Sequence, residues 1–264
     1  MNIEKRSIVI LLVFFLSCGK NIKTVTKVEN MYSKIKKELA PDKRTELFDI
    51  QFHLLNGAII LKGETTSKKA LLRLQDSLKY SQVNFKSEVR ILPDSSLENR
   101  PFAIAKNSVI NIRSNPKHSA ELGTQGLLGM ALRVLDKKGD FYRIQTPDNY
   151  ISWVDKGGIQ RMNKRDFDLW NASKKVLFTN NVGQVFASKK KNSTIISDIT
   201  LGGVLKYLSE DASFYKVTYP DNRTGFIKKN EAIIYGSWLK NLKSTPENIE
   251  VIAKKMNGFP YLWG

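Results

Sequence analysis

Few residues of this chain have side chains suited to nucleophilic, proton-transfer or soft metal chemistry. Its 264 residues include one cysteine, Cys18, and two histidines, His53 and His118. A catalytic thiolate needs a neighbouring base and a group that orients that base, and a zinc centre usually takes three or four nitrogen, sulfur or carboxylate ligands. One cysteine also excludes an intrachain disulfide. We therefore expect no catalytic residue, metal site or cofactor within these 264 residues.

Cys18 lies at the end of an export signal. Lys5 and Arg6 precede an apolar run, Ile8 to Leu16, which is too short for a membrane-spanning helix of roughly 20 residues. Ser17 then stands directly before the cysteine, an order that resembles the lipobox of bacterial lipoproteins. The resemblance implies a signal peptide over 1–17, lipidation of Cys18 and a polar tether over 18–29. The alternative is an ordinary signal peptide, or a buried apolar segment, with an incidental cysteine.

The net charge is +18, from 43 Lys and Arg against 25 Asp and Glu. Nucleic acid is the usual partner of so basic a protein, but export would separate the two, and we expect no nucleic-acid partner. We favour the simpler interpretation that lysines spread over exposed faces keep the protein soluble. Binding to anionic lipid headgroups or to cell-wall polymers is the alternative.

The first folded segment mixes helices and strands. Apolar residues at helical spacing predict a short helix over 31–40 and another over 67–80. Alternation from Phe48 to Leu54, the Asn56-Gly57 pair and a return over 58–61 predict a hairpin, and 83–92 alternates again. The order αββαβ over 30–93 resembles a BON-type domain, an envelope-associated module. His53 falls on the polar face of the first strand, so we interpret it as a surface residue.

An internal repeat follows a polar linker that ends at Pro101. Residues 128–154 align without a gap on residues 201–227, with nine of 27 positions identical. Each copy has short apolar alternation, a Pro-Asp-Asn turn and an aromatic strand, which is typical of a small antiparallel barrel. We therefore predict two separate β-barrels, over 101–162 and 174–235.

The first copy carries a family resemblance. Val109-Ile110-Asn111-Ile112-Arg113-Ser114-Asn115-Pro116, followed by Leu128-Gly129, Phe141-Tyr142 and Trp153-Val154, resembles the bacterial SH3 domain. The second copy lacks the Arg-Ser-x-Pro stretch, so a ligand that this loop binds in the first copy is not expected to bind identically in the second. Tyr142 and Trp153 recur as aromatic residues, which assigns them to the cores.

The last twenty residues resemble a second family. Thr245-Pro246-Glu247 starts a helix with one apolar stripe, and Gly258 ends it before Pro260-Tyr261-Leu262-Trp263-Gly264. This segment, 245–264, resembles the opening of the NlpC/p60 cysteine peptidase domain. Together with two SH3 modules, it resembles the lipoprotein γ-D-glutamyl-L-diamino acid endopeptidases, which trim peptidoglycan stem peptides. The fold class expected for the chain is mainly β, with an α+β N-terminal domain, two SH3-like barrels and a C-terminal helix.

The resemblance also implies which residues meet a ligand. In that family the nucleophilic Cys follows further along the chain, so we expect a chain truncated before it and inactive alone. Tyr150 matches a position that lines the substrate cleft, although a half-exposed barrel residue is an equal alternative. Tyr261 matches the tyrosine that lines the nucleophile's pocket, and Met130 stands where an acidic residue is frequent. His118 is interpreted as a solvated loop residue.

Two functions from different classes follow. The first is the substrate-recognition and targeting portion of a peptidoglycan stem-peptide endopeptidase, held at the periplasmic or extracellular face of a membrane by its lipid anchor. The second is a non-enzymatic lipoprotein whose tandem SH3 domains bind peptidoglycan or an envelope partner. The coding sequence after Gly264 distinguishes them, because only the first predicts a continuation that encodes Asp-Cys-Ser-Gly.

Overall fold

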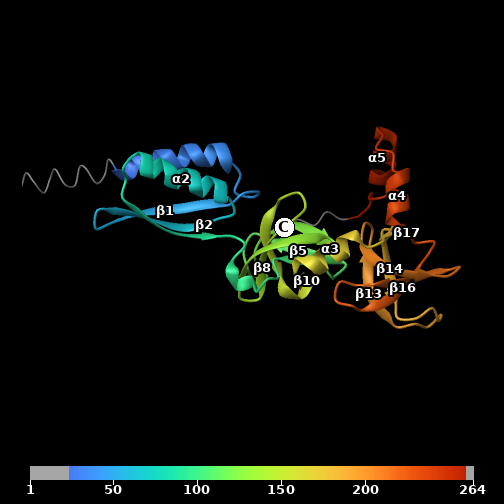
Figure 1. The fold of residues 1–264 in the computed structure, drawn as a ribbon. Coiled ribbons are helices and arrows are strands. Elements are labelled where there is room, and N and C mark those ends of the chain that lie inside the picture. The colour runs from blue at the N-terminus through green and yellow to red at the C-terminus, as the bar shows by residue number, and fades with distance from the viewer. Residues whose placement is uncertain (1–23, 260–264) are drawn as a thin grey trace, which may run out of the picture. The chain divides into compact units, whose positions relative to one another are not determined.

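A computed structural model describes residues 24–259, in two compact units that divide after Asp94. Figure 1 shows the elements along the chain. The fold is mainly β, as expected, with one three-stranded sheet in the first unit and two seven-stranded antiparallel sheets in the second. Cys18 and Tyr261 lie outside the described residues. Within those residues, no helix combines the length and the apolar character needed to cross a membrane.

The first unit packs two helices on one sheet. A helix over residues 24–39 precedes β1 (Phe48–Leu55), β2 (Ala58–Thr65), α2 (Lys68–Tyr80) and β3 (Phe85–Ile91). Strand β2 pairs antiparallel with β1 and parallel with β3. The predicted hairpin is present, because Asn56 and Gly57 take positive φ angles of 51° and 76°. The stripe of α2 that faces the core consists of Ala70, Leu71, Leu74 and Leu78.

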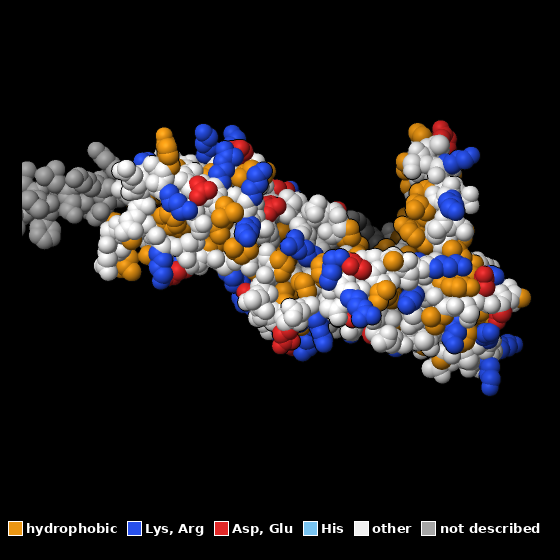
Figure 2. Space-filling view, in the orientation of Figure 1, with side chains coloured by type: hydrophobic (Ala, Val, Ile, Leu, Met, Phe, Trp, Pro, Cys, Tyr) orange, Lys and Arg blue, Asp and Glu red, His pale blue; other side chains and the backbone are white. Residues whose placement is uncertain are grey.

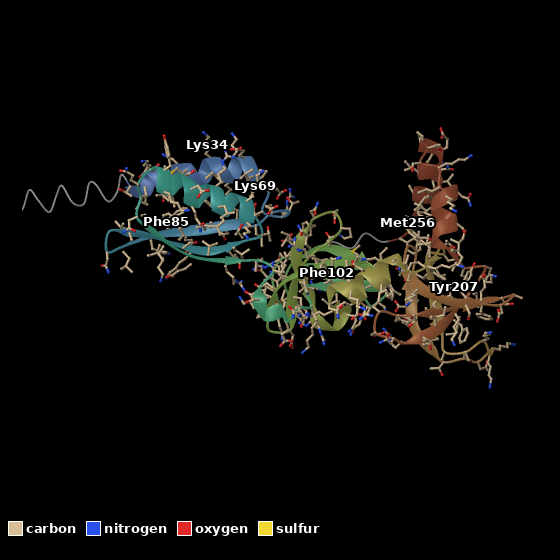
Figure 3. The ribbon with its side chains drawn as sticks, viewed as in Figure 1. Lys34, Lys69, Phe85, Phe102, Tyr207 and Met256 are labelled. Atoms are coloured by element: carbon tan, nitrogen blue, oxygen red, sulfur yellow. The ribbon has the colours of Figure 1, made fainter. Side chains whose placement is uncertain are left out.

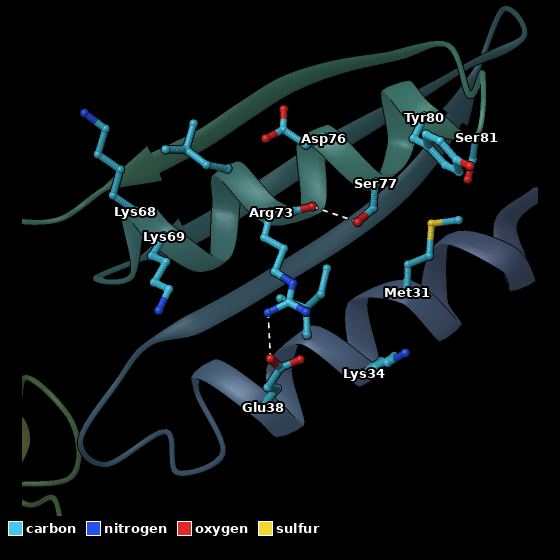
Figure 4. Close-up of a pocket in the computed structure, with 12 residues that line it drawn as sticks. Met31, Lys34, Glu38, Lys68, Lys69, Arg73, Asp76, Ser77, Tyr80 and Ser81 are labelled. Carbon is cyan, nitrogen blue, oxygen red and sulfur yellow. Dashed lines mark hydrogen bonds and ion pairs between the residues drawn. The ribbon is translucent and has the colours of Figure 1, made fainter.

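The first helix differs from the prediction in where it begins. Residues 24–30 are already helical, and Val28 is fully buried in the core of the unit. Residues 24–29 of the expected tether are therefore part of the fold. The two helices are joined by an ion pair of 2.6 Å between Arg73 and Glu38, beside a groove of about 910 Å³ (Figure 4). His53 is exposed on β1, as predicted.

The second unit contains the repeat. Its first sheet consists of β4 (Phe102–Ala105), β5 (Val109–Arg113), β6 (Leu122–Leu127), β7 (Ala131–Lys138), β8 (Phe141–Gln145), β9 (Ile151–Asp155) and β10 (Ile159–Met162). Its second sheet consists of β11 (Lys175–Phe178), β12 (Val182–Phe186), β13 (Ile195–Thr200), β14 (Val204–Glu210), β15 (Phe214–Thr218), β16 (Thr224–Lys228) and β17 (Ala232–Ile234).

The two sheets have one topology. The first runs β10-β4-β7-β8-β9-β5-β6, and the second, read from its other edge, runs β17-β11-β14-β15-β16-β12-β13. Equivalent residues, 73 positions apart, also share backbone geometry: Gly129 and Gly202 have φ angles of 86° and 87°, and Asn149 and Asn222 both have 68°. The internal repeat is therefore confirmed at the level of strands, turns and single residues.

The structure differs from the predicted separate barrels in two ways. Among the described residues the pairings leave β10 and β6, and likewise β17 and β13, at the edges, so each sheet is open. The repeats are also docked to each other. Leu128 of the first repeat lies in the core of the second, its carbonyl accepts a 2.9 Å bond from the Val204 N–H, and Ser108 bonds Asp198 at 2.6 Å. The hydrophobic core of the second repeat therefore contains residues from both repeats.

Short helices connect these parts. The 3-10 helix η1 (Ser95–Leu97) buries Leu97 within the predicted linker, and η2 (Lys156–Gly158) follows β9. Helix α3 (Lys164–Ala172), which was not predicted, joins the repeats and stacks Phe167 on Phe102 with ring centroids 4.6 Å apart. Figure 3 labels Phe102 among the side chains of the first repeat.

The C-terminal helix forms where its sequence places it. Helix α4 (Tyr235–Asn241) precedes α5 (Pro246–Lys254), and Thr245 caps α5 by accepting the Asn248 N–H. The apolar stripe of α5 and the residues after it are largely uncovered, with exposed fractions of 60% for Ile249 and 54% for Phe259. Figure 2 shows hydrophobic side chains on the surface over α4 and α5. The apolar stripe predicted for this helix is therefore present, and it forms an exposed patch.

Candidate ligand-binding site of the first repeat

Tyr150 is held by the turn between β8 and β9. Thr146 accepts the Tyr150 N–H at 3.0 Å through its hydroxyl oxygen and donates its own N–H to the Tyr150 carbonyl at 3.0 Å. Asn149, between them, takes the left-handed backbone that this turn requires. Local sequence thus fixes the backbone from which the tyrosine projects.

The phenol of Tyr150 lies over a glycine of strand β6, which β5 separates from β9 in the sheet. A Cβ atom at Gly123 would stand 2.6 Å from the phenol oxygen, so a side chain at position 123 would require the phenol to shift. The ring is half-buried against the core of the first repeat, and among the described residues its hydroxyl has no hydrogen-bond partner. Tyr150 is therefore both a packing residue and a free donor, which accommodates both interpretations left open by the sequence.

Met130 lies against the same core as Tyr150. It follows the Leu127-Leu128-Gly129 turn, is half-buried, and would have its sulfur 3.0 Å from a Cβ atom at Gly126. A thioether is a weak acceptor and carries no charge. The structure thus offers the phenol of Tyr150 here without a carboxylate from residue 130.

A large groove runs beside this site, with a volume of about 1050 Å³. The first repeat contributes the turn from Leu127 to Ala131 and Pro147, the end of α3 contributes Trp170, and the second repeat and the C-terminal helices form the rest. Most of these groups are apolar, which suits the packing of another protein surface more than the binding of a small polar ligand.

One cation lines this groove in an unusual setting. The ammonium of Lys175 donates to the Ser173 carbonyl at 3.0 Å, to its hydroxyl at 2.9 Å and to the Trp170 carbonyl. Burial, with a smaller contribution from the positive charge of Lys206, lowers the pKa of Lys175 to about 8. Because the ammonium caps the end of α3, we assign Lys175 a structural role.

Both histidines are exposed on the surface of the described chain. His118 is largely exposed in the loop after β5, as predicted, with its ring 5.0 Å from that of Phe141 and its Nε2 3.5 Å from the Asp155 carboxylate. His53 lies in the other unit. Across residues 24–259 no three His, Cys, Asp or Glu side chains gather in a way that could hold a metal ion. Trp153 is buried and Tyr142 half-buried, in agreement with their assignment to the core.

Comparisons with known proteins support the resemblance seen in the sequence. Residues 112–159 match the family described as the bacterial dipeptidyl-peptidase Sh3 domain. Over 153 residues the chain is 29% identical to a gamma-D-glutamyl-L-lysine dipeptidyl-peptidase of Bacillus cereus (strain ATCC 10987 / NRS 248), an alignment that covers 54% of this chain and 44% of that protein. The chain thus spans less than half the length of this curated relative.

A solved structure shares the fold. The crystal structure of an NlpC/P60 family protein from Bacillus cereus ATCC 10987 superposes with a TM-score of 0.53 at 21% identity, over 61% of this chain and 65% of that one. The predicted resemblance to an SH3-containing NlpC/p60 protein is therefore confirmed, with the first repeat as the segment that matches the SH3 family.

Proposed function

We propose that this chain is the substrate-recognition and targeting portion of a peptidoglycan stem-peptide endopeptidase of the cell envelope. The observation that carries the proposal is the position of Tyr150 inside the segment that matches the dipeptidyl-peptidase SH3 family. The turn fixes the backbone of Tyr150, and its hydroxyl, which has no hydrogen-bond partner among the described residues, lies over Gly123, as suits a recognition residue.

The two repeats act as a pair of SH3 domains over 101–162 and 174–235, preceded by a BON-like domain over 30–93 and followed by the opening of a peptidase domain over 245–264. Their shared strand order and docked turns support one rigid recognition body. Because Tyr150 corresponds to Arg223 in the second repeat, we assign recognition of the stem peptide to the first repeat.

These 264 residues would not hydrolyse a peptide unaided. Thiolate catalysis needs a cysteine beside a base, and Cys18 is the only cysteine. His118 is largely exposed and packs on Phe141, and His53 lies on the other unit's sheet. We propose instead that Cys18 is acylated and holds the protein on a membrane at the periplasmic or extracellular face. Several acyl chains on one cysteine would make that anchor firm.

Stem-peptide binding by the soluble chain from residue 19 onward tests the proposal. The probe is a free-amine stem peptide with a γ-D-glutamyl-L-lysine bond, and the measurement is isothermal titration calorimetry. Removing one hydrogen bond of about 1 kcal/mol corresponds to about fivefold in Kd, so Tyr150→Phe should bind about fivefold more weakly. Tyr80→Phe, which removes a phenol oxygen from an exposed position in the first unit, is the matched control.

The outcomes separate the possibilities. Equal affinity of the Tyr150→Phe variant and the parent would remove Tyr150 from recognition. Failure of the parent to bind either stem peptide or purified sacculi would refute the proposed function. The second candidate, a non-enzymatic envelope module that binds a protein partner, is favoured by the uncovered apolar side chains of α4 and α5, and it predicts a partner that substitutions in α5 release.

A further inference from the structure

The two repeats contain the same small cavity. The first cavity has a volume of about 300 Å³ and the second about 320 Å³. The second is lined by Val182, Gly183, Gln184, Phe186, Asp198, Lys228 and Glu231. Shifted back by 73 positions these are residues 109, 110, 111, 113, 125, 155 and 158, and all except 125 line the first cavity. A hollow that recurs at equivalent residues is a property of the fold.

The first cavity offers hydrogen-bond donors. One N–H of the Arg113 guanidinium donates to the Ala120 carbonyl at 2.7 Å, and among the described residues the guanidinium makes no other hydrogen bond. Asn111 accepts from Gln125 through its carbonyl oxygen, which leaves its amide N–H groups for a ligand. Asn107 adds a further amide on the rim. These groups suit an anionic oxygen.

The one carboxylate in the first cavity is already engaged. An Asp155 oxygen accepts the Gly157 N–H at 2.6 Å, and the other lies 3.5 Å from His118 Nε2. The far wall is the ring of Phe141, covered by His118. The cavity is therefore a small concave site with one cation, free amide donors and an aromatic wall, near the lower end of the size range of ligand pockets.

The second cavity keeps the shape and changes the charges. Phe186 replaces Arg113 and Lys228 replaces Asp155, so the single cation lies on the other strand. Lys228 is paired with Glu231 at 3.4 Å, and Asp198 adds a second carboxylate that accepts a bond from Ser108. An anion would meet a neutralised cation and two carboxylates there. The same hollow thus favours an anion in the first repeat only.

We propose that the Arg113 cavity is a binding site for the carboxylate of a short peptide or of an acidic sugar. The carboxylate meets the Arg113 guanidinium and the Asn111 amide, and the adjoining group of the ligand packs on the aromatic wall that His118 forms over Phe141. This site does not depend on the recognition proposed for Tyr150, because Tyr150 is not among its lining residues.

The test titrates the soluble chain from residue 19 onward with three probes, monitored by amide chemical shifts in NMR. N-acetyl-alanyl-alanine carries a terminal carboxylate, its C-terminal amide lacks one, and glucuronic acid presents a carboxylate on a sugar. For a peptide ligand we expect N-acetyl-alanyl-alanine to shift the amide signals around Arg113, and we expect its C-terminal amide to cause no shifts. Binding of glucuronic acid alone would assign the site to acidic sugars. Equal binding of the peptide acid and amide, or no binding of either acid, would overturn the proposal.

Variants separate the site from the fold. Arg113→Gln should weaken binding at least tenfold, and Asn111→Asp, which keeps the Gln125 contact and adds a negative charge, should do the same in a chain whose other amide shifts are unchanged. Arg165→Gln on α3 and Lys228→Gln in the second cavity are the matched controls and should leave binding within twofold. Loss of binding in the Lys228→Gln variant, or normal binding in Asn111→Asp, would contradict the assignment. Either result leaves the Tyr150 test untouched.

Discussion

Exchanging one pair of core residues between the repeats should show that the two repeats fill the same core volume with side chains from different strands. Phe178 lies on β11 and Gly183 on β12, and the equivalent residues of the first repeat are Ala105 and Ile110. The second repeat thus has a large side chain on β11 and none on β12. The first repeat has a small side chain on the equivalent strand β4 and a large one on β5. We predict that Gly183→Ile is destabilising alone and is rescued by Phe178→Ala.

The magnitudes follow from the contact distances. Glycine within a strand is ordinarily about 0.5–1 kcal/mol worse than alanine, which would make Gly183→Ala stabilising. A Cβ atom there would lie only 2.2 Å from Cζ of Phe178, a ring that is fully buried. Overpacking of this kind costs about 1–3 kcal/mol, so the clash decides the sign. Phe178→Ala alone should cost about 3–5 kcal/mol through the cavity it leaves.

The double variant Phe178→Ala, Gly183→Ile approximately conserves volume and should lie within about 1.5 kcal/mol of the parent. Native-state hydrogen exchange at amides of the second repeat is the suitable assay, because it reports the stability of one cooperative unit in a chain that has several. If the double variant loses as much unfolding free energy as the two single variants lose together, the coupling energy is zero and the proposed equivalence is refuted.

Three further predictions test the remaining contacts. Gly129→Ala should undock the repeats and raise protease sensitivity between them, since a Cβ there would lie 2.3 Å from the Val204 carbonyl and Gly129 has positive φ; resistance equal to the parent's would disprove it. The pKa of Lys175 is about 8 in the folded chain and 10.5 ordinarily, so between pH 8 and 10.5 the unfolded chain binds more protons than the folded one. In this range the free energy of unfolding of the parent should therefore rise with pH relative to that of Lys175→Met. Stability curves that run parallel for the two proteins would exclude this. Ile249→Glu with Met256→Glu should reduce self-association of the soluble chain in sedimentation, because both side chains are exposed, whereas Lys254→Glu should not; identical profiles for the parent and the double variant would remove α5 from the contact.

Local signals in the sequence predicted those parts of the fold that depend on neighbouring residues. The Asn56-Gly57 hairpin, the Thr245 cap and the duplicated turns each depend on residues a few positions apart. The first helix was predicted too short because only two of the residues over 24–30 are apolar, and Val28 is buried by a sheet that lies further along the chain. Helix α3 has just Phe167, Leu169 and Trp170 as large apolar residues, too few for a periodic signal.

The geometry of the candidate site depends on contacts between residues that lie far apart in the chain, and the spacing of residues in the sequence does not reveal such contacts. Tyr150 could be nominated by resemblance, but its position over Gly123 comes from the pairing of strands that are not adjacent in the chain. Likewise Leu128 lies in a turn that matches Leu201, and nothing in that turn indicates that the residue enters the other repeat's core. The shared cavity became visible only when the two repeats were compared residue by residue in space.

The pattern of differences between the repeats explains why only one of them is expected to recognise a ligand. Two pairs of residues with left-handed backbone are the same in both copies, namely the glycines at 129 and 202 and the asparagines at 149 and 222. Residues that would meet a ligand differ in chemistry, since Tyr150 corresponds to Arg223 and Arg113 to Phe186. The second copy thus keeps the scaffold and the docking turn but not the groups that we propose to recognise a ligand. The contact that the second repeat makes with the first is structural, since Leu128 of the first repeat lies in the core of the second.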